Sequence, residues 1–495
     1  MARPSPAPLS LVLKKGLIAS NMARATIFID KDTISHPAIN FRYDDSKKDV
    51  MLVRMNEGLS QGPFYDTYHK MDMYFEALYW KTNESYFDFK MLPGPGVETS
   101  AVFESEDFFD QDRLKEIKGY NDVNPLYKVN KFFRERKENV APLIDLVDYM
   151  KYAKEDVKSF VMQLAVLGFV EYNIDRELIT AKPKMRNFIQ AEGKKRDYDI
   201  IQLKSKVKNK ENARLSLMNY DLQIHGVGVV QLSDSQIVNV FPYNGEITVK
   251  KNRDFEFTGK IEAGLFDFYA KKCEFNYDKF NLDMTVVDSV TFFVENKKGE
   301  QNREGEYPLV KVQSVIEDIK GVIEIDEPNN KSGTKSTPLY PIFTSTTPGY
   351  VYYNKPYIYD GVYKKNKFFF RVNPFKIEKL DDFATDSIEF NGYLVSAGIF
   401  EDITKPLKVR PDYSLGFVHQ TPESGMIAYG GKGMFINKID LSNKGLRGFG
   451  TINYLVSTGT TNDCLFFPDS SNAMLDTYTV REQEAGTQYP SVTGT

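Results

Sequence analysis

The spacing of hydrophobic residues changes period along this chain. Runs rich in aromatic and β-branched residues are typical of strands, and they cover 25–29, 39–43, 50–54, 212–222, 254–261, 282–287 and 434–439. A Lys-Asp turn and the His36-Pro37 step are expected to separate the first two runs. The pattern therefore predicts a mainly β protein.

Between 104 and 192 the hydrophobic period becomes helical. Apolar residues recur at i, i+3, i+4 and i+7 in two sets, which are Leu143, Leu146, Val147 and Met150, and Val157, Phe160, Val161 and Leu164. Pro142 suits a first helical turn, and Gly168 suits a helix end. A hairpin over 169–180 and a short helix over 185–191 complete the prediction, which is a winged-helix-like α+β subdomain inserted in the β regions.

One strand-like sequence motif occurs twice. Residues 255–266 read FEFTGKIEAGLF and residues 388–400 read IEFNGYLVSAGIF, so that Phe257-x-Gly259 matches Phe390-x-Gly392. Repetition of a strand unit indicates an elongated, antiparallel or repeat-like sheet. Glycines inside strands predict bulges, bends or a close approach of another backbone.

These patterns divide the chain into five segments. We expect a disordered lead-in at 1–20, an N-terminal β region at 21–103, the helical subdomain at 104–196, a repetitive β region at 197–470 and a frayed or truncated tail at 471–495.

Composition narrows the class of protein. Aromatic residues make up 14% of the chain, which favours packed sheets. The net charge of −4 argues against a dedicated nucleic-acid binder. Two cysteines and four histidines, none at metal-ligand spacing, exclude a disulfide scaffold and make a zinc site improbable. No apolar run is long enough for a membrane-spanning helix, and Lys14-Lys15 interrupts the apolar start, so no signal peptide is predicted.

Candidate catalytic motifs each have a simpler structural interpretation. The YGGKG stretch at 429–433 lacks the first glycine and the final hydroxyl of a phosphate loop, and predicts a turn before a strand. The Gly226-Val227-Gly228 stretch lacks a third glycine and predicts flat strand.

Isolated acidic pairs and one histidine are equally weak indicators. Asp381 with Asp382, and Asp283 with Asp288, are expected in solvated turns, and His419 is expected half-buried at a strand end. The sequence therefore predicts no catalytic, cofactor-binding or metal-binding residue, and no enzyme or cofactor.

If the helical subdomain bound DNA, residues 154–167 would be its recognition helix. That helix carries Lys154 and Lys158 beside Glu155 and Asp156, and a basic cluster follows at 194–196. Without a basic reading face, packing or protein contact is the favoured interpretation.

Four long motifs, at 29–41, 57–80, 250–284 and 412–457, resemble a family of large exported β-rich proteins of unknown function from Bacteroidetes-type bacteria. The resemblance runs from about residue 20 over nearly the whole chain. It implies an internal fragment of a longer protein and a place in the cell envelope, either periplasmic or associated with the outer membrane. It implies no catalytic residue.

These observations leave three hypotheses, the first of which has two versions. The first is a non-enzymatic scaffold of the bacterial cell envelope, with an envelope protein or lipid as partner rather than nucleic acid. Its lipid-transfer-like version requires a β groove with an apolar, unburied face. The second hypothesis is a DNA-binding regulator that uses the winged-helix-like segment. The third is a carbohydrate-active enzyme, which needs two carboxylates facing each other across a groove.

Overall fold

The computed structural model describes residues 11–92, 100–119, 124–382, 388–480 and 492–494. Strands form 49% and helices 14% of the chain, so the fold is mainly β with large antiparallel sheets. The chain forms two compact units. Unit 1 comprises residues 1–261, 272–282 and 324–338, and unit 2 comprises 262–271, 283–323 and 339–495. The expected β region at 197–470 is therefore divided between both units.

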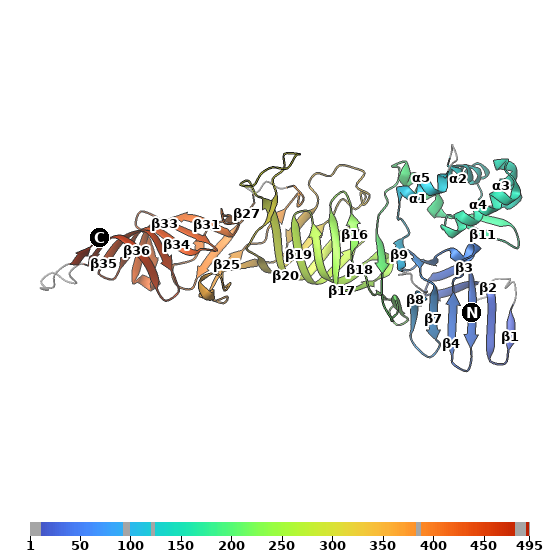
Figure 1. Cartoon of the computed structure of the whole chain (residues 1–495), viewed down its shortest axis with the longest axis horizontal. Coiled ribbons are helices and arrows are strands. Elements are labelled where there is room, and N and C mark those ends of the chain that lie inside the picture. Colours follow the sequence, from blue (N-terminus) through green and yellow to red (C-terminus); the bar gives the residue numbers. More distant parts are fainter. Residues whose placement is uncertain (1–10, 93–99, 120–123, 383–387, 481–491, 495) are drawn as a thin grey trace. The chain divides into compact units, whose positions relative to one another are not determined.

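Unit 1 contains two antiparallel paths of strands that share β3 (Figure 1). The first path runs β1 (Val12–Lys14), β2 (Leu17–Ile29), β3 (Asp32–Asp44), β4 (Asp49–Val53), β7 (Ala77–Lys81), β8 (Tyr86–Lys90), β14 (Ala213–Ser216), β15 (Leu222–Ile224), β17 (Val238–Val249) and β16 (Val230–Ser233). The second path runs from β3 through β5 (Phe64–Asp66), β6 (Met71–Tyr74) and β9 (Ala101–Ser105) to β13 (Gln202–Ser205).

Stacked phenylalanine rings connect the two strand paths. Phe64 on β5 lies 4.4 Å from Phe75, and Phe75 lies 4.6 Å from Phe89 on β8, measured between ring centroids. All three side chains are fully buried. Aromatic enrichment in the sequence thus corresponds to a packed interior in this part of unit 1.

The His36-Pro37 step lies inside β3, so the expectation that it separates two strands is wrong. The turn before β3 is at Asp30–Lys31 instead. The register of β2 with β3 shifts between the pairs Ala23↔Ile39 and Ala25↔His36. Proline has no N–H for a ladder hydrogen bond, and this irregularity is where a strand tolerates it.

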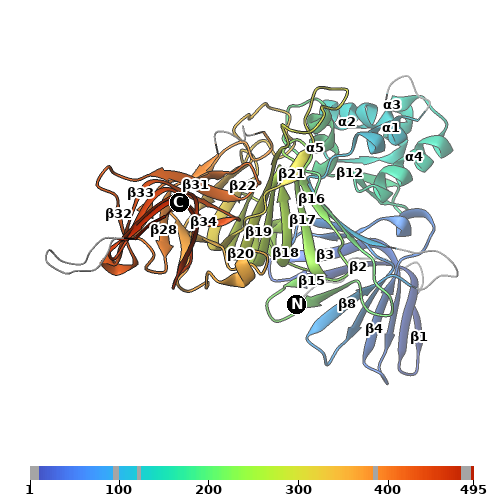
Figure 2. The same ribbon diagram turned by 60° about the vertical axis from the view of Figure 1, so that its left-hand side comes forward.

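The helical segment comprises α1 (Gln111–Lys118), α2 (Pro125–Arg136), β10 (Val140–Pro142), α3 (Leu143–Met150), α4 (Lys154–Val166), β11 (Val170–Asn173), β12 (Leu178–Ala181) and α5 (Pro183–Glu192). Figure 2 shows the five helices gathered in one cluster. The three strands pair in the order β10-β12-β11. The stripes that predicted α3 and α4 point into the shared core, where Leu143, Leu146, Val161 and Leu164 are fully buried.

Helices α1 and α2 were not predicted from the sequence. In α2, Asn124 accepts a hydrogen bond from the Leu126 N–H at 3.0 Å, and Pro125 occupies the first turn. The α1 helix buries only Leu114 and Ile117, which is too little periodicity to stand out in the sequence.

Strands of unit 2 form further antiparallel ladders. They are β21 (Leu309–Lys311), β23 (Ile342–Ser345), β24 (Gly349–Tyr352), β25 (Phe368–Val372), β26 (Lys376–Ile377), β27 (Glu389–Phe390), β28 (Gly392–Ser396), β29 (Ile403–Thr404), β30 (Leu407–Val409), β31 (Leu415–Gln420), β32 (Met426–Ala428), β33 (Gly433–Ser442), β34 (Gly445–Tyr454), β35 (Ser457–Phe466), β36 (Ser471–Val480) and β37 (Val492–Gly494). Four strands contribute residues to both units, which are β18 (Phe255–Ala263), β19 (Phe266–Asn276), β20 (Asn281–Glu295) and β22 (Ile316–Glu324).

Both ends of the chain carry strands where none was expected. Strands β1 and β2 begin inside the predicted lead-in, and β36 lies inside the predicted tail. Residues 1–10, 481–491 and 495 lie outside the described part of the chain, so those parts of the two predictions stay open.

The glycines of the repeat have the predicted close backbone contacts. A Cβ added at Gly259 would lie 2.3 Å from the carbonyl oxygen of Phe241, and one at Gly392 would lie 2.1 Å from that of Arg371. In each copy a second glycine, Gly264 or Gly398, has a positive φ in the turn that follows the strand. The repeated sequence thus corresponds to a repeated local backbone geometry.

We predict that Gly259→Ala destabilises unit 1 by about 2 kcal/mol or more, because its methyl group would overlap the backbone of β17. Gly228→Ala is the matched control, since a Cβ there has no atom within 4 Å and its φ is not in the left-handed region. Thermal unfolding followed by circular dichroism compares the variants. Equal midpoints for the two would contradict the prediction.

Candidate functional site

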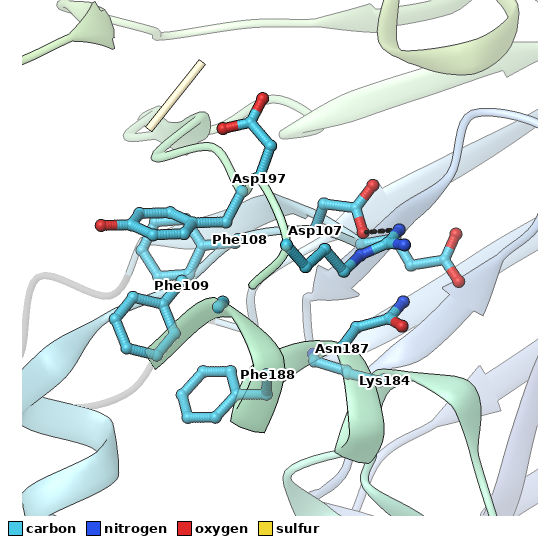
Figure 3. Close-up of a pocket in the computed structure, with 11 residues that line it drawn as sticks. Asp107, Phe108, Phe109, Lys184, Asn187, Phe188 and Asp197 are labelled. Carbon is cyan, nitrogen blue, oxygen red and sulfur yellow. Dashed lines mark hydrogen bonds and ion pairs between the residues drawn. The ribbon is translucent and has the colours of Figure 1, made fainter. Parts of the chain in front are cut away.

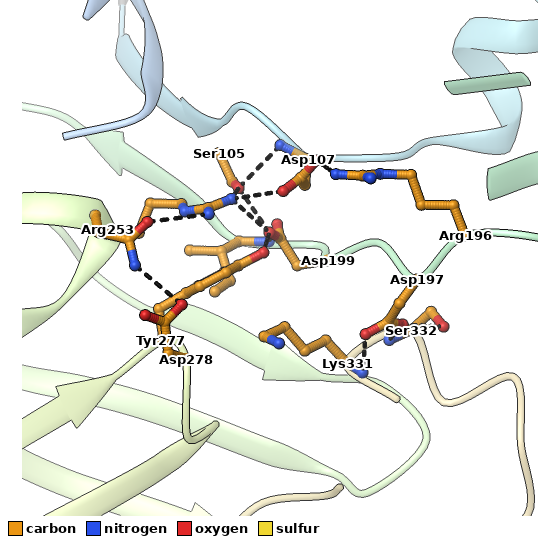
Figure 4. Close-up of polar contacts among 12 residues, drawn as sticks. Ser105, Asp107, Arg196, Asp197, Asp199, Arg253, Tyr277, Asp278, Lys331 and Ser332 are labelled. Atoms are coloured by element: carbon orange, nitrogen blue, oxygen red, sulfur yellow. Dashed lines mark hydrogen bonds and ion pairs between the residues drawn. The ribbon is translucent and has the colours of Figure 1, made fainter. Parts of the chain in front are cut away.

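Asp199 is the most deeply buried carboxylate of a polar cluster in unit 1. Its Oδ2 accepts hydrogen bonds from the Ser105 and Tyr277 hydroxyls, both at 2.6 Å, and its Oδ1 accepts the Ile201 N–H at 3.0 Å (Figure 4). The side chain is fully shielded from solvent. Burial raises the pKa of Asp199, although each of these hydrogen bonds favours its ionised form.

Arg253 supplies the positive charge of the cluster. Its Nη1 lies 3.0 Å from Asp107 Oδ2 and 3.8 Å from Asp199 Oδ2, and it donates to Ser105 Oγ at 3.2 Å (Figure 4). The guanidinium also lies 3.5 Å from the ring centroid of Tyr277. Burial and the neighbouring Asp199 carboxylate raise the pKa of Tyr277, so it remains a hydroxyl donor.

Two further residues extend the cluster toward the surface. Arg196 donates to Asp107 Oδ1 at 3.1 Å. Burial alone would raise the pKa of Asp107, but Arg253 and Arg196 hold it below its usual range. Asp197 fixes the loop at 324–338 by accepting the N–H groups of Lys331 and Ser332 at 2.8 and 3.0 Å.

The cluster borders one small cavity of about 10 Å³, lined by Asp107, Lys184, Asn187, Phe188 and Asp197 among others (Figure 3). That space holds about one water molecule. Arg253 and Arg196 pair with Asp107, Asp199 accepts three hydrogen bonds, and Asp197 accepts backbone N–H groups. The arrangement therefore suits cross-linking of distant segments better than proton transfer to a substrate.

A second charged group lies where α5 meets the sheet. The Lys184 ammonium binds Asp72 and lies 3.8 Å from Glu104, and Glu104 accepts two hydrogen bonds from Arg113 at 2.7 and 2.8 Å. Burial would lower the pKa of Lys184, but these two carboxylates raise it overall. Here two cations balance two anions.

Packing of α4 bears on the DNA-binding interpretation. The Tyr65 hydroxyl donates to the Ala165 carbonyl of α4 at 3.2 Å, and Met162 lies against Gly58 of the 3-10 helix η1 (Gly58–Gln61). Lys154 forms an ion pair with Glu177 at 2.9 Å. One face of α4 therefore packs inside unit 1, and the start of its open face carries mixed charge.

His36 of β3 binds Gly62, the residue that follows η1. Its Nε2 donates to the Gly62 carbonyl at 3.0 Å, and its Nδ1 accepts the Ala38 N–H at 3.1 Å, so the ring is the neutral Nε2-protonated tautomer. Burial lowers the pKa of His36 to about 4, and the Arg54 charge contributes.

The residues singled out in the sequence do not join this cluster. Gly430 and Gly431 form the expected turn before β33. Residues 226–228 lie outside the strands, with only Val227 in an isolated antiparallel bridge to Ser205, so the expectation of flat strand is wrong. Gly226 has a positive φ, and an added Cβ there would lie 2.1 Å from the carbonyl oxygen of Lys206.

The acidic pairs and His419 are likewise separate from the cluster. Asp283 and Asp288 are exposed but lie on strand β20, so the expectation that this pair lies in turns is wrong. Asp381 and Asp382 lie in a turn after β26, as expected. His419 lies on β31, and its partial burial lowers its pKa.

The cluster itself was missed because its members are far apart in sequence. Ser105 and Arg253 are separated by 148 positions, and Asp199 and Tyr277 by 78. The only local indication is two charged short stretches, SED at 105–107 and DYD at 197–199, which are ordinary in a chain with 27% charged residues.

Among the residues that the structure describes, no helix is long and apolar enough to cross a membrane, and no group of three or more His, Cys, Asp or Glu side chains is placed to hold a metal ion. Comparison of the chain with models of protein families, with curated proteins and with solved structures finds no match.

We predict that Asp199→Asn destabilises the protein by about 2 kcal/mol. An amide has one acceptor oxygen where the carboxylate has two, so either the Ser105 and Tyr277 hydroxyls or the Ile201 N–H would face an NH2 group, and Arg253 loses a counter-charge. Asp175→Asn, at an exposed turn position, removes the same charge as a control. Thermal unfolding measures both. A control as unstable as Asp199→Asn would contradict the prediction.

A second prediction concerns the loss of folding stability at low pH. Unfolded His36 takes up a proton below about pH 6.5, whereas the folded form does so only near pH 4, so acidification favours unfolding. His36 should therefore account for roughly 2 kcal/mol of the stability lost between pH 7.5 and pH 5. His36→Gln keeps a donor for Gly62 and should lose correspondingly less stability over this range in urea unfolding. An unchanged pH dependence would contradict this assignment.

Proposed function

We propose that this chain is a non-enzymatic, β-rich scaffold protein of the bacterial cell envelope. The observation that carries the proposal is the mutual compensation of its buried charges. Asp199 is satisfied by Ser105, Tyr277 and Arg253, and it has no exposed surface. Groups used in this way stabilise a particular arrangement of segments, and they offer a substrate neither access nor a free proton donor.

The place in the envelope rests on the resemblance of the motifs at 250–284 and 412–457 to exported Bacteroidetes-type proteins. The partner that fits such a role is an envelope protein or a lipid rather than nucleic acid, in keeping with the net charge of −4.

A lipid-transfer-like groove is the first alternative. It requires an apolar sheet face that is open to a ligand. Support for it is weak, because the alternating inward residues of β18, which include Phe255, Phe257 and Ile261, are at most 5% exposed. A lipid would have to displace side chains that already pack together.

A DNA-binding regulator is the second alternative. The order β10-α3-α4-β11-β12, with strand order β10-β12-β11, is compatible with a winged-helix-like module. Because α4 packs against Tyr65 and η1 on one side, we propose that this module serves internal packing and protein contact.

Fractionation of a Bacteroidetes-type bacterium that produces the tagged protein tests the proposal. We expect the protein in the envelope fraction, with protein partners captured by cross-linking in cells. Asp199→Asn should lose those partners in proportion to its unfolded fraction, and Asp175→Asn should retain them. Recovery in the cytoplasmic fraction, or recovery bound to DNA, would overturn the proposal.

A further inference from the structure

A cationic cavity lies between α2, the end of β12 and the start of α5. It encloses about 150 Å³ and is lined by polar groups from each element, which include Asn130 and Arg134 of α2, Asn139 before β10, Lys182 after β12, and Arg186 and Asn187 of α5. No acidic side chain lines it. The cavity is about ten times larger than the space needed for one water molecule, so it has room for a small polyatomic ligand.

The two arginines of this cavity are solvent-exposed. Within the described ranges of the chain, neither Arg134 nor Arg186 forms an ion pair. Two other cations of α2 are paired with carboxylates, since Arg136 lies 2.8 Å from Asp145 and Lys131 lies 3.7 Å from Glu135, whereas Lys128 donates to the Tyr152 hydroxyl at 2.9 Å. Arg134 therefore differs from Arg136 and Lys131 of the same helix in that no carboxylate pairs with it among the described residues.

Lys182 lines the cavity, but its ammonium group is directed to an aromatic ring outside the lining. Its ammonium lies 3.3 Å from the ring centroid of Tyr65, a residue that does not line the cavity. The amide side chains of Asn130, Asn139 and Asn187 form no hydrogen bond with any described residue, so their N–H groups are available to a ligand. Two guanidinium groups and three amides form a donor-rich lining.

We propose that this cavity binds a small oxyanion of the phosphate class, either free phosphate or the phosphate of a lipid headgroup. A guanidinium presents a planar fork of N–H donors that matches two oxygens of one phosphate. Arg134 and Arg186 come from different helices, so one anion held by both would join α2 to α5. The bound anion would supply the counter-charge that the surrounding side chains do not supply.

Isothermal calorimetry with inorganic phosphate tests the site in the full chain. The test variant is Arg134→Gln with Arg186→Gln. The control is Lys131→Gln with Arg176→Gln, which removes two charges from exposed positions of the same helical segment outside the cavity. We expect phosphate to bind the wild type and the control equally, and to bind the test variant at least about tenfold more weakly. Circular dichroism checks that both variants are folded.

Sedimentation with vesicles distinguishes the two sources of phosphate. Binding to phosphatidic acid vesicles, but not to phosphatidylcholine vesicles, with the same dependence on Arg134 and Arg186, assigns a lipid headgroup. Binding of inorganic phosphate alone assigns a soluble anion. Failure of the wild type to bind phosphate would overturn the proposal. Equal weakening in both double variants would do so as well, because it would indicate general charge attraction. Binding of duplex DNA in place of phosphate would also overturn the assignment.

Discussion

The energetic cost of burying charge is the constraint on which unit 1 depends. Asp199 has no solvent contact, and an ionised carboxylate in such a place is tolerated only with donors on its oxygens and a cation nearby. Ser105, Tyr277, Ile201 and Arg253 meet that requirement, and they come from four separate parts of the chain. If one of these segments moved away, Asp199 would lose a hydrogen-bond donor or its counter-charge. The buried carboxylate therefore constrains the positions of these segments relative to one another.

Charge compensation also attaches the helical segment to the strands. Lys184 of α5 reaches Asp72 of β6 and Glu104 of β9, while Arg113 of α1 holds Glu104 from the other side. Apolar packing fixes the helices relative to each other, and the same core includes Ala38 of β3 and Leu59 of η1. The charged group makes this attachment directional, since hydrogen-bond geometry is directional and apolar contact is not.

The elements that were predicted correctly are those whose formation depends on residues close together in the sequence. Periodicity gave α3, α4, the β11–β12 hairpin and α5, because each buries one face within a few residues. The predictions failed at Pro37, which lies in β3 beside a register shift against β2, and at residues 226–228, where the Gly226 backbone comes close to the distant residue Lys206. The charged cluster could not be predicted, since no short-range pattern relates residue 105 to residues 199, 253 and 277. The cavity at Arg134 and Arg186 was missed for the same reason.

The loop at 324–338 bears on how the chain reaches its folded state during synthesis. The backbone N–H groups of Lys331 and Ser332 in this loop donate to Asp197. Residues 262–271 and 283–323 lie between Asp197 and this loop in the sequence, and they belong to unit 2. A ribosome releases the chain from its N-terminus onward, so unit 1 cannot be completed until part of the next unit has already emerged. Folding of the two units is therefore interleaved in time, and a pause in translation before residue 332 would leave unit 1 without the partner of Asp197.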